Sequence, residues 1–252
     1  MDTMLWLAAG IFLPLFPLSM IFNLVFQRVN TAWLRVLLLF AWPSIGVWLV
    51  ATNSSDMPEW FYVWAILTAI LYAFRSVVIK EISVWTGFIA TSAWSLVWVA
   101  IAHDLNTDNL MMHVMSFSVP LVLLAILVAR LELQYESAYA GVVTGLAQEQ
   151  PRMTGILVVI MLAAIGSPVF PSFFSLLSNI NNNITMLPFV AIAITLVWLL
   201  WSWSCIRLLQ ELLVGKPAIM QHDDIGPGLS LFYAMVFVLL VIGGLFMSEV
   251  ML

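Results

Sequence analysis

The chain has 252 residues, of which 63% are hydrophobic and 8% are charged, and its formal net charge is −5. Soluble domains carry about 25% charged residues, so this composition excludes a soluble globular protein and indicates a membrane protein whose first partner is the lipid bilayer. The net charge comes from a scarcity of Lys and Arg rather than from an acidic tail, so we expect no nucleic-acid partner.

Eight apolar stretches are long enough to cross a bilayer, which takes roughly 20 residues. In chain order they cover residues 4–26, 33–51, 60–79, 82–102, 110–129, 153–178, 187–209 and 229–247. The first stretch has no basic residues before it, so we do not expect a cleaved signal peptide. The sequence therefore predicts an all-α polytopic membrane protein of about eight transmembrane helices, folded as a single bundle over residues 1–252.

The Lys and Arg residues all fall in connections on one side of these spans. They are Arg28, Arg35, Arg75, Lys80, Arg130, Arg152, Arg207 and Lys216. An odd number of spans would scatter them over both sides, which favours eight. By the positive-inside rule this side faces the cytoplasm, so we expect a multi-pass protein of the bacterial inner (plasma) membrane with both termini on the non-cytoplasmic side.

Two connections have a distinctive composition. Residues 130–152 interleave apolar and polar side chains, which predicts a short amphipathic helix at the membrane interface or a cover for a partner subunit. His222, Asp223 and Asp224 form a polar loop cluster that we interpret as solvated rather than as a cation site.

The span 153–178 is interrupted near its middle by Gly166, Pro168 and Pro171. Proline removes a backbone donor and clashes with the preceding turn, so we predict that this one helix is broken. Broken helices in transporters mark ion or substrate sites, although a simple proline kink is the alternative interpretation.

Few ionisable side chains suit a proton or ion pathway. His113 is the one that we place well inside a span, while Lys80 and Glu81 are adjacent at a span end. Neighbouring residues on a helix point in different directions, and interfacial anchoring is the plainer role for this pair. The chain has no H-E-x-x-H, no G-x-S-x-G and no Cys/His metal set, so we expect no enzyme activity, no metal site and no cofactor.

An ordered set of motifs resembles a known family. The segments that carry the resemblance are Arg75 to Gly87, His113 to Leu124, Gly145-Leu146-Ala147 followed by Pro151, and Gly166 to Ser175. They are similar to motifs of the antiporter-like membrane subunits shared by respiratory complex I, Mrp cation antiporters, membrane-bound hydrogenases and the DabB-type subunits of inorganic-carbon uptake complexes. The resemblance covers roughly the second half of such a subunit, residues 60–250 here, while the two N-terminal helices in residues 1–57 show no clear family match.

The resemblance also shows which residues have been lost. In the family a lysine in the histidine helix and a lysine or glutamate in the broken helix carry protons, and here these positions hold Leu121 and Leu176. The second histidine of the motif appears as Phe117, and residues 1–51 supply no internal acid within their two apolar helices.

Two functions are compatible with this pattern. The first is an accessory, non-conducting antiporter-like subunit of a multi-subunit proton- or cation-coupled complex, of the NADH-quinone oxidoreductase (complex I), Mrp or DabB inorganic-carbon type. Its expected partners are other membrane subunits, among them a full-length antiporter-like subunit and a soluble catalytic module. The alternative is a free-standing or conducting ion-coupled transporter that uses His113 and the broken helix.

Overall fold

The computed structural model describes residues 2–53, 57–103, 106–185, 187–215 and 223–251. Within these ranges the regular structure is helical, apart from an isolated bridge between Glu81 and Tyr139. The helices are α1 (Asp2–Phe12), α2 (Ser19–Arg28), α3 (Ala32–Thr52), α4 (Trp60–Ser76), α5 (Ile82–Ser95), α6 (Val97–Ile101), α7 (Thr107–Tyr135), α8 (Leu146–Glu149), α9 (Pro151–Ala164), α10 (Pro171–Ile184), α11 (Pro188–Leu213) and α12 (Pro227–Met251). The predicted all-α class is confirmed.

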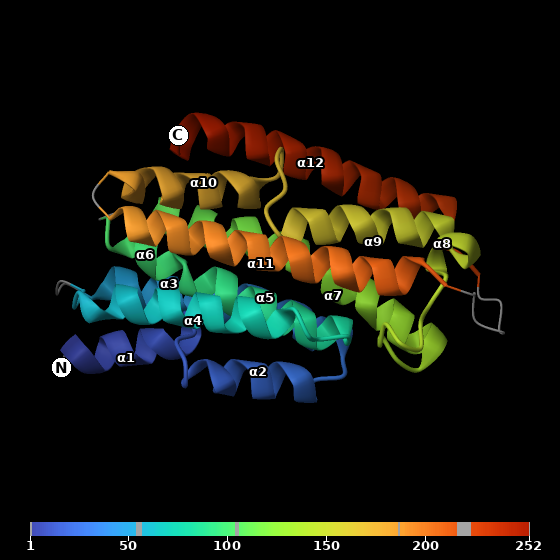
Figure 1. Ribbon diagram of the computed structural model, residues 1–252, viewed down its shortest axis with the longest axis horizontal. Coiled ribbons are helices and arrows are strands. Elements are labelled where there is room, and N and C mark those ends of the chain that lie inside the picture. Colours follow the sequence, from blue (N-terminus) through green and yellow to red (C-terminus); the bar gives the residue numbers. More distant parts are fainter. Residues whose placement is uncertain (1, 54–56, 104–105, 186, 216–222, 252) are drawn as a thin grey trace.

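The helices run side by side along the long axis of the molecule (Figure 1). In the described chain, α3, α5 with α6, α7, α11 and α12 are long and apolar enough to cross a membrane, and α4 and α9 are shorter apolar helices. Each predicted span corresponds to one helix or to a consecutive pair, the pairs being α1 with α2, α5 with α6, and α9 with α10. The protein is therefore a multi-pass membrane protein.

The predicted break in the span 153–178 is confirmed, since α9 ends at Ala164 and α10 begins at Pro171. The first span is broken as well, which we did not predict from the sequence. Residues 4–26 do not form a continuous helix: α1 ends at Phe12 and α2 begins at Ser19, with Pro14 and Pro17 between them. Each proline lacks the N–H that a continuous helix requires and its ring clashes with the turn before it. A milder offset at Leu96 separates α5 from α6.

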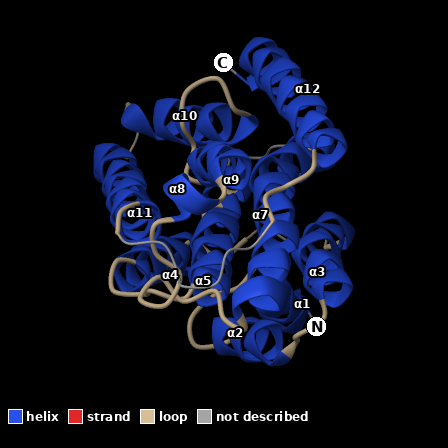
Figure 2. Cartoon of the chain, turned by 90° about the vertical axis from the view of Figure 1, so that its right-hand side faces the viewer, coloured by secondary structure: helices blue, strands red, loops and turns tan. Residues whose placement is uncertain are grey.

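Burial separates the centre of the bundle from its edge. The α5–α6 span is 89% buried and α7 is 72% buried, whereas the α12 span is only 17% buried. Figure 2 shows α5 surrounded by other helices and α12 on the outside. The largest fully buried side chains include Trp85, Trp94, Trp98 and Trp201, so the core is built around indole rings.

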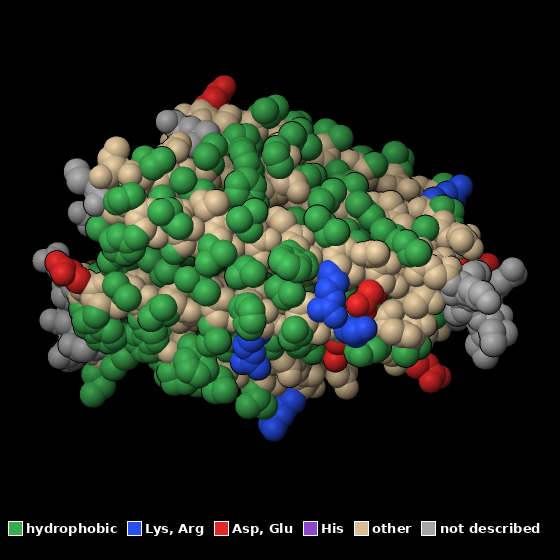
Figure 3. Space-filling model, viewed as in Figure 1, with side chains coloured by type: hydrophobic (Ala, Val, Ile, Leu, Met, Phe, Trp, Pro, Cys, Tyr) green, Lys and Arg blue, Asp and Glu red, His purple; other side chains and the backbone are tan. Residues whose placement is uncertain are grey.

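Charged residues gather where the helices end. The seven described Lys and Arg residues lie in or next to the ends of α2, α4, α7 and α11 and the starts of α3, α5 and α9. These helix ends meet on the right of Figure 1, and both termini lie on the left. The eighth, Lys216, lies outside the described residues. In Figure 3 the Lys and Arg side chains lie from near the middle of the face to its right end, and the surface to their left is broadly apolar, as a lipid-facing belt requires.

The prediction of an amphipathic helix in residues 130–152 was wrong, because between the end of α7 at Tyr135 and the start of α9 at Pro151 only the four residues of α8 are helical. Helix α7 continues to Tyr135 and stops at Glu136, which has φ 58°. The chain then pairs with the segment before α5, since Ala140 N–H donates to the Lys80 carbonyl at 2.9 Å and Ile82 N–H donates to the Ala138 carbonyl at 3.1 Å. These extended contacts use the backbone groups that an interfacial helix would have needed.

Candidate functional site

The break between α9 and α10 lies within the membrane. Each helix has 14 residues, which is about 21 Å at 1.5 Å per residue, against a hydrocarbon core of about 30 Å. Gly166 turns the chain at φ +76°, and a Cβ there would lie 2.7 Å from Cδ1 of Leu176. Val169 has φ 85°, which is rare for a β-branched residue. Only a tightly held segment keeps this conformation.

Some backbone groups freed by this break are satisfied from nearby. Ser172 Oγ donates to the Ala163 carbonyl, and Ser167 N–H donates to the Leu162 carbonyl at 3.1 Å. The Val169 N–H has no acceptor, however, and the carbonyls of Gly166, Pro168 and Val169 have no donor among the described residues. The second break is therefore only partly satisfied by the chain itself.

The break between α1 and α2 is closed from inside the bundle. Three indole N–H groups donate to carbonyls of the break region, and one hydroxyl accepts a hydrogen bond from its backbone: Trp42 to Ile11 at 3.0 Å, Trp98 to Leu13 at 2.9 Å, Trp64 to Phe16, and Phe16 N–H to Thr68 Oγ1 at 3.1 Å. Indole is a donor only, so it suits a carbonyl that has lost its helical partner.

His113 lies where the broken helix meets α7. Its side chain is 1% exposed, and its Nδ1 shares a hydrogen bond with Oγ of Ser175, one turn into α10. The other ring nitrogen, Nε2, has no partner in the described structure. Four residues further along the same face of α10, the amide oxygen of Asn179 is also buried and unpaired. His113 and Ser175 thus form a small buried polar contact, which together with Asn179 one turn further along α10 we call the His113 cluster.

The polar cluster is a property of the whole buried face of α10. Ser172, Ser175, Ser178, Asn179 and Asn183 are all buried, while Ile184 is 57% exposed. Up to residue 180 the buried face of α10 is therefore mainly polar, while Phe173, Phe174, Leu177 and Ile180 are only partly buried.

The positions at which the family carries charge are filled by packed apolar side chains. Leu121 and Leu176 are buried, and Leu176 rests against Gly166. Phe117, which stands where the family has its second histidine, packs edge-on against Trp201 with ring centroids 5.7 Å apart. At these positions the side chains are apolar and cannot be ionised.

Buried hydroxyls elsewhere in the centre are paired with tryptophan. Indole N–H groups donate to serine Oγ in three pairs: Trp85 to Ser204 at 3.0 Å, Trp94 to Ser118 at 3.1 Å, and Trp201 to Ser92 at 3.0 Å. These pairs connect α5 to α11 and α7. Each pair therefore satisfies the indole N–H of one helix with a hydroxyl of another, from within the protein.

Lys80 and Glu81 do not join the His113 cluster. Lys80 Nζ lies 3.1 Å from Glu211 Oε2 on α11, and Arg207 lies 3.5 Å from the same carboxylate. Glu81 accepts a hydrogen bond from Ser83 Oγ at 2.8 Å instead. Both residues lie at the basic end of the bundle, whereas His113 lies in the second turn of α7 at the other end.

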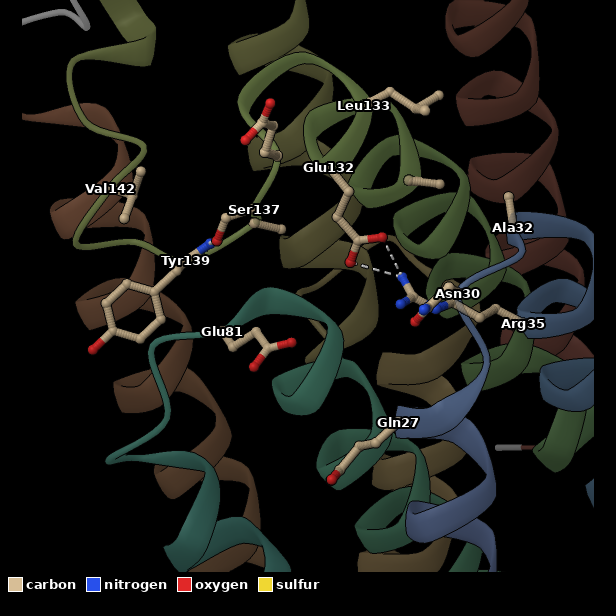
Figure 4. Close-up of a pocket in the computed structure, with 13 residues that line it drawn as sticks. Gln27, Asn30, Ala32, Arg35, Glu81, Glu132, Leu133, Ser137, Tyr139 and Val142 are labelled. Atoms are coloured by element: carbon tan, nitrogen blue, oxygen red, sulfur yellow. Dashed lines mark hydrogen bonds and ion pairs between the residues drawn. The ribbon is translucent and has the colours of Figure 1, made fainter.

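Glu81 lines a pocket of about 740 Å³ at the basic end (Figure 4). The same pocket is lined by Arg35, which is buried, and Glu132, whose two carboxylate oxygens accept from Arg35 Nη1 at 2.8 and 2.9 Å. Arg35 also donates from Nε to the Val29 carbonyl, so its guanidinium is well satisfied. This ion pair holds the start of α3 against the end of α7.

Asp224, which we interpreted as solvated, has a structural role. Its carboxylate accepts hydrogen bonds from the backbone N–H groups of Arg152 at 2.9 Å and Met153 at 3.1 Å. It therefore caps the start of α9, where free N–H groups and the helix dipole favour a negative charge. Among the described residues no group of three His, Cys, Asp or Glu side chains is arranged to hold a metal ion.

Sequence reasoning missed the first break although a signal was present. Pro14-Leu15-Phe16-Pro17 and Pro168-Val169-Phe170-Pro171 share the pattern Pro, aliphatic residue, Phe, Pro. The repeat marks both breaks. The Arg35–Glu132 pair left no local signal, because its two members lie 97 residues apart.

Comparison with solved structures identifies the fold. The chain superposes on a chain of respiratory complex I from Thermus thermophilus (TM-score 0.83, 19% identity), one of the archaeal membrane-bound sulfane sulfur reductase (0.80, 14%) and one of the Mrp complex from Dietzia sp. DQ12-45-1b (0.76, 14%). The likeness to antiporter-like membrane subunits is thereby confirmed as a likeness of fold. No family model and no curated protein matches the sequence.

The superpositions also define the extent of the match. They cover 96%, 96% and 86% of this chain but 54%, 51% and 43% of the other chains, so the chain spans about half the length of the structures it matches. A match over 96% of the chain includes most of the residues before Trp60, so the likeness of fold extends into the N-terminal helices.

Proposed function

We propose that this chain, with the fold of an antiporter-like membrane subunit, is an accessory and non-conducting subunit of a multi-subunit ion-coupled membrane complex. The observation that carries the proposal is the isolation of His113. Among the described residues, Arg35 and His113 are the only Lys, Arg, Asp, Glu or His side chains that are buried, and they lie at opposite ends of α7. Proton transfer needs titratable groups within hydrogen-bond reach, directly or through water.

The packed interior supports the same proposal. Leu121, Leu176 and Phe117, which are buried, stand where the family has the groups that carry protons, and the Trp–Ser pairs join α5 to α7 and α11 in the centre. The fold persists although its conducting residues are absent. A role in sealing or scaffolding a larger complex requires the fold and not the charges.

The test is to purify the tagged chain from its native membrane in mild detergent and to identify the proteins that accompany it. Stoichiometric recovery with a full-length antiporter-like subunit or a soluble catalytic module supports the proposal. The accompanying subunits distinguish complex I-like, Mrp-like and DabB-type assemblies. Recovery of the chain alone contradicts the proposal.

A conducting transporter is the second candidate, because His113 Nε2 is free and its ring contacts α10 soon after the break. His113→Ala separates the two functions. We expect ion flux through the assembled complex to stay near the wild-type rate, as it should for His103→Ala, the control at the end of α6. Loss of flux in an intact His113→Ala complex would establish the conducting role. Changing Pro168 and Pro171 together should mainly reduce assembly.

We propose further that the basic end faces the cytoplasm of a bacterial plasma membrane, with both termini outside. The argument is the gathering of Lys and Arg at one end of the bundle. A reporter that is active only outside the cytoplasm, fused after residue 252, should be active, and a cytoplasmic fluorescent reporter fused there should be dark. The reverse pattern would invert the topology.

A further inference from the structure

The segment Ser167–Pro168–Val169, which we call the break loop, lies deep in the membrane and yet has exposed side chains. It lies between two helices that each reach about 21 Å into the membrane from opposite sides. Pro168 is exposed, and Val169 is 47% exposed. Figure 2 shows the connection from α9 to α10 passing over the outside of the bundle between α10 and α12. Non-helical backbone therefore faces outward at the depth of the hydrocarbon.

Lipid cannot satisfy this backbone. The Val169 N–H and the Pro168 and Val169 carbonyls have no hydrogen-bond partner in the described chain. Irregular backbone at this depth occurs where protein or a water-filled cavity covers it, and not against acyl chains. The first break shows how the same fold solves the problem internally, with indole donors on its carbonyls.

The flank of the break loop is fixed by α12. A Cβ on Gly244 would lie 2.2 Å from the Val169 carbonyl oxygen, so α12 touches the backbone of the loop directly and α10 closes the other side. The outward side of Val169 stays uncovered. The surface that remains is a narrow strip of backbone and small side chains beside α12.

We infer that a transmembrane helix of another membrane subunit covers the break loop and donates side-chain hydrogen bonds to its free carbonyls. This inference rests on the proposed role as a subunit of a larger complex. The occupant must be mainly a donor, because in the break loop the Pro168 and Val169 carbonyls lack a donor among the described residues and the Val169 N–H lacks an acceptor. A second copy of this chain would bring the same excess of acceptors, so two break loops do not satisfy each other. The chemistry fits a helix with Ser, Thr, Asn or Gln at the contact.

The experiment places the photo-crosslinking residue p-benzoylphenylalanine at Val169 in the tagged chain, in its native membrane with all partner subunits present. The matched control is Phe16, which is 37% exposed at the first break, where indoles already satisfy the carbonyls. We expect an adduct with another membrane subunit from position 169, at a yield several-fold above that from position 16. Peptide mapping should place the adduct in a transmembrane segment, next to a hydrogen-bonding side chain whose change to Ala lowers the yield several-fold.

Ser167 serves as a second labelled position, so that failure of one variant to fold does not end the test. Adducts with lipid alone, or with a second copy of this chain, would overturn the inference, as would equal yields from positions 169 and 16. Partner subunits that co-purify without a crosslink at 169 or 167 leave the proposed function standing and refute the inference. Absence of any co-purifying subunit refutes the proposed function itself.

Discussion

The two broken helices of this protein begin from the same four-residue pattern and are completed in different ways. The α1–α2 break receives hydrogen bonds from three tryptophans on α3, α4 and α6. The α9–α10 break has one serine hydroxyl, a few backbone hydrogen bonds of its own and the close approach of Gly244, while the Val169 N–H and the Pro168 carbonyl have no partner among the described residues. A broken helix is therefore not a functional signature by itself. Its meaning depends on where the partners of the freed backbone come from.

The largest effect is expected from Gly244→Ala. The added methyl group would overlap the Val169 carbonyl, and because a backbone atom cannot rotate away, we expect a loss of about 3 kcal/mol, at the upper end of overpacking costs. The midpoint temperature of thermal unfolding in detergent and the yield of co-purified partner subunits should both decrease. Gly155→Ala on α9, where a Cβ meets nothing within 4 Å, is the matched control. Equal stability of the two variants would show that α12 does not hold the second break.

A smaller loss is expected from Trp98→Phe, which tests the first break. The change removes the N–H that satisfies the Leu13 carbonyl and leaves that acceptor buried, at a cost of about 2 kcal/mol. The control is Trp203→Phe, because Trp203 is 66% exposed and should tolerate the change. The stability of both variants is measured as the midpoint temperature of thermal unfolding. If Trp98→Phe were as stable as the wild type, water or lipid headgroups would have to satisfy the first break, and the contrast between the breaks would disappear.

The smallest effect is expected from Ser172→Ala. Its hydroxyl donates to the Ala163 carbonyl, which lies at the end of α9, so its loss should cost about 1 kcal/mol. Ser202 Oγ also donates to a carbonyl, that of Trp198 at 2.9 Å, but within the continuous helix α11. Ser202→Ala should therefore change the unfolding midpoint less than Ser172→Ala. The opposite order would mean that the second break gains little from its own serine.

The positions of the apolar helices along the chain were predictable because the length of an apolar stretch is a local property. The second break was predictable because Gly166 stands beside two prolines. The first break was missed because Pro14 and Pro17 lie in an otherwise uninterrupted apolar run, where hydropathy alone indicates a continuous span. The hydrogen bond from Trp98 to the Leu13 carbonyl, 85 residues away in the sequence, depends on tertiary packing that no local pattern encodes.

For the candidate site residues too, the local environment was predictable from the sequence and the distant partners were not. The burial of His113 followed from its place in an apolar run, and the structure adds its contact with Ser175. The separation of Lys80 and Glu81 toward different neighbours agrees with their adjacency, but the partner of Lys80, Glu211, lies on a distant helix. The sequence indicated that Asp224 lies in a polar loop. That it caps α9 depends on the tertiary structure, which places the loop before α12 beside the start of α9.

The inward polar face of α10 has a consequence for biosynthesis. This helix has 14 residues and is not among the apolar helices of the described chain that suit a membrane by length and composition. A nascent helix with this many serines and asparagines has little free energy to gain by moving from the translocation channel into lipid by itself, because its polar groups would then contact acyl chains. It becomes stable in lipid only when α7 and α11 are there to receive its polar side. The order of synthesis places α7 before α10 and α11 directly after it, so this part of the bundle should leave the channel as a unit of several helices rather than one helix at a time.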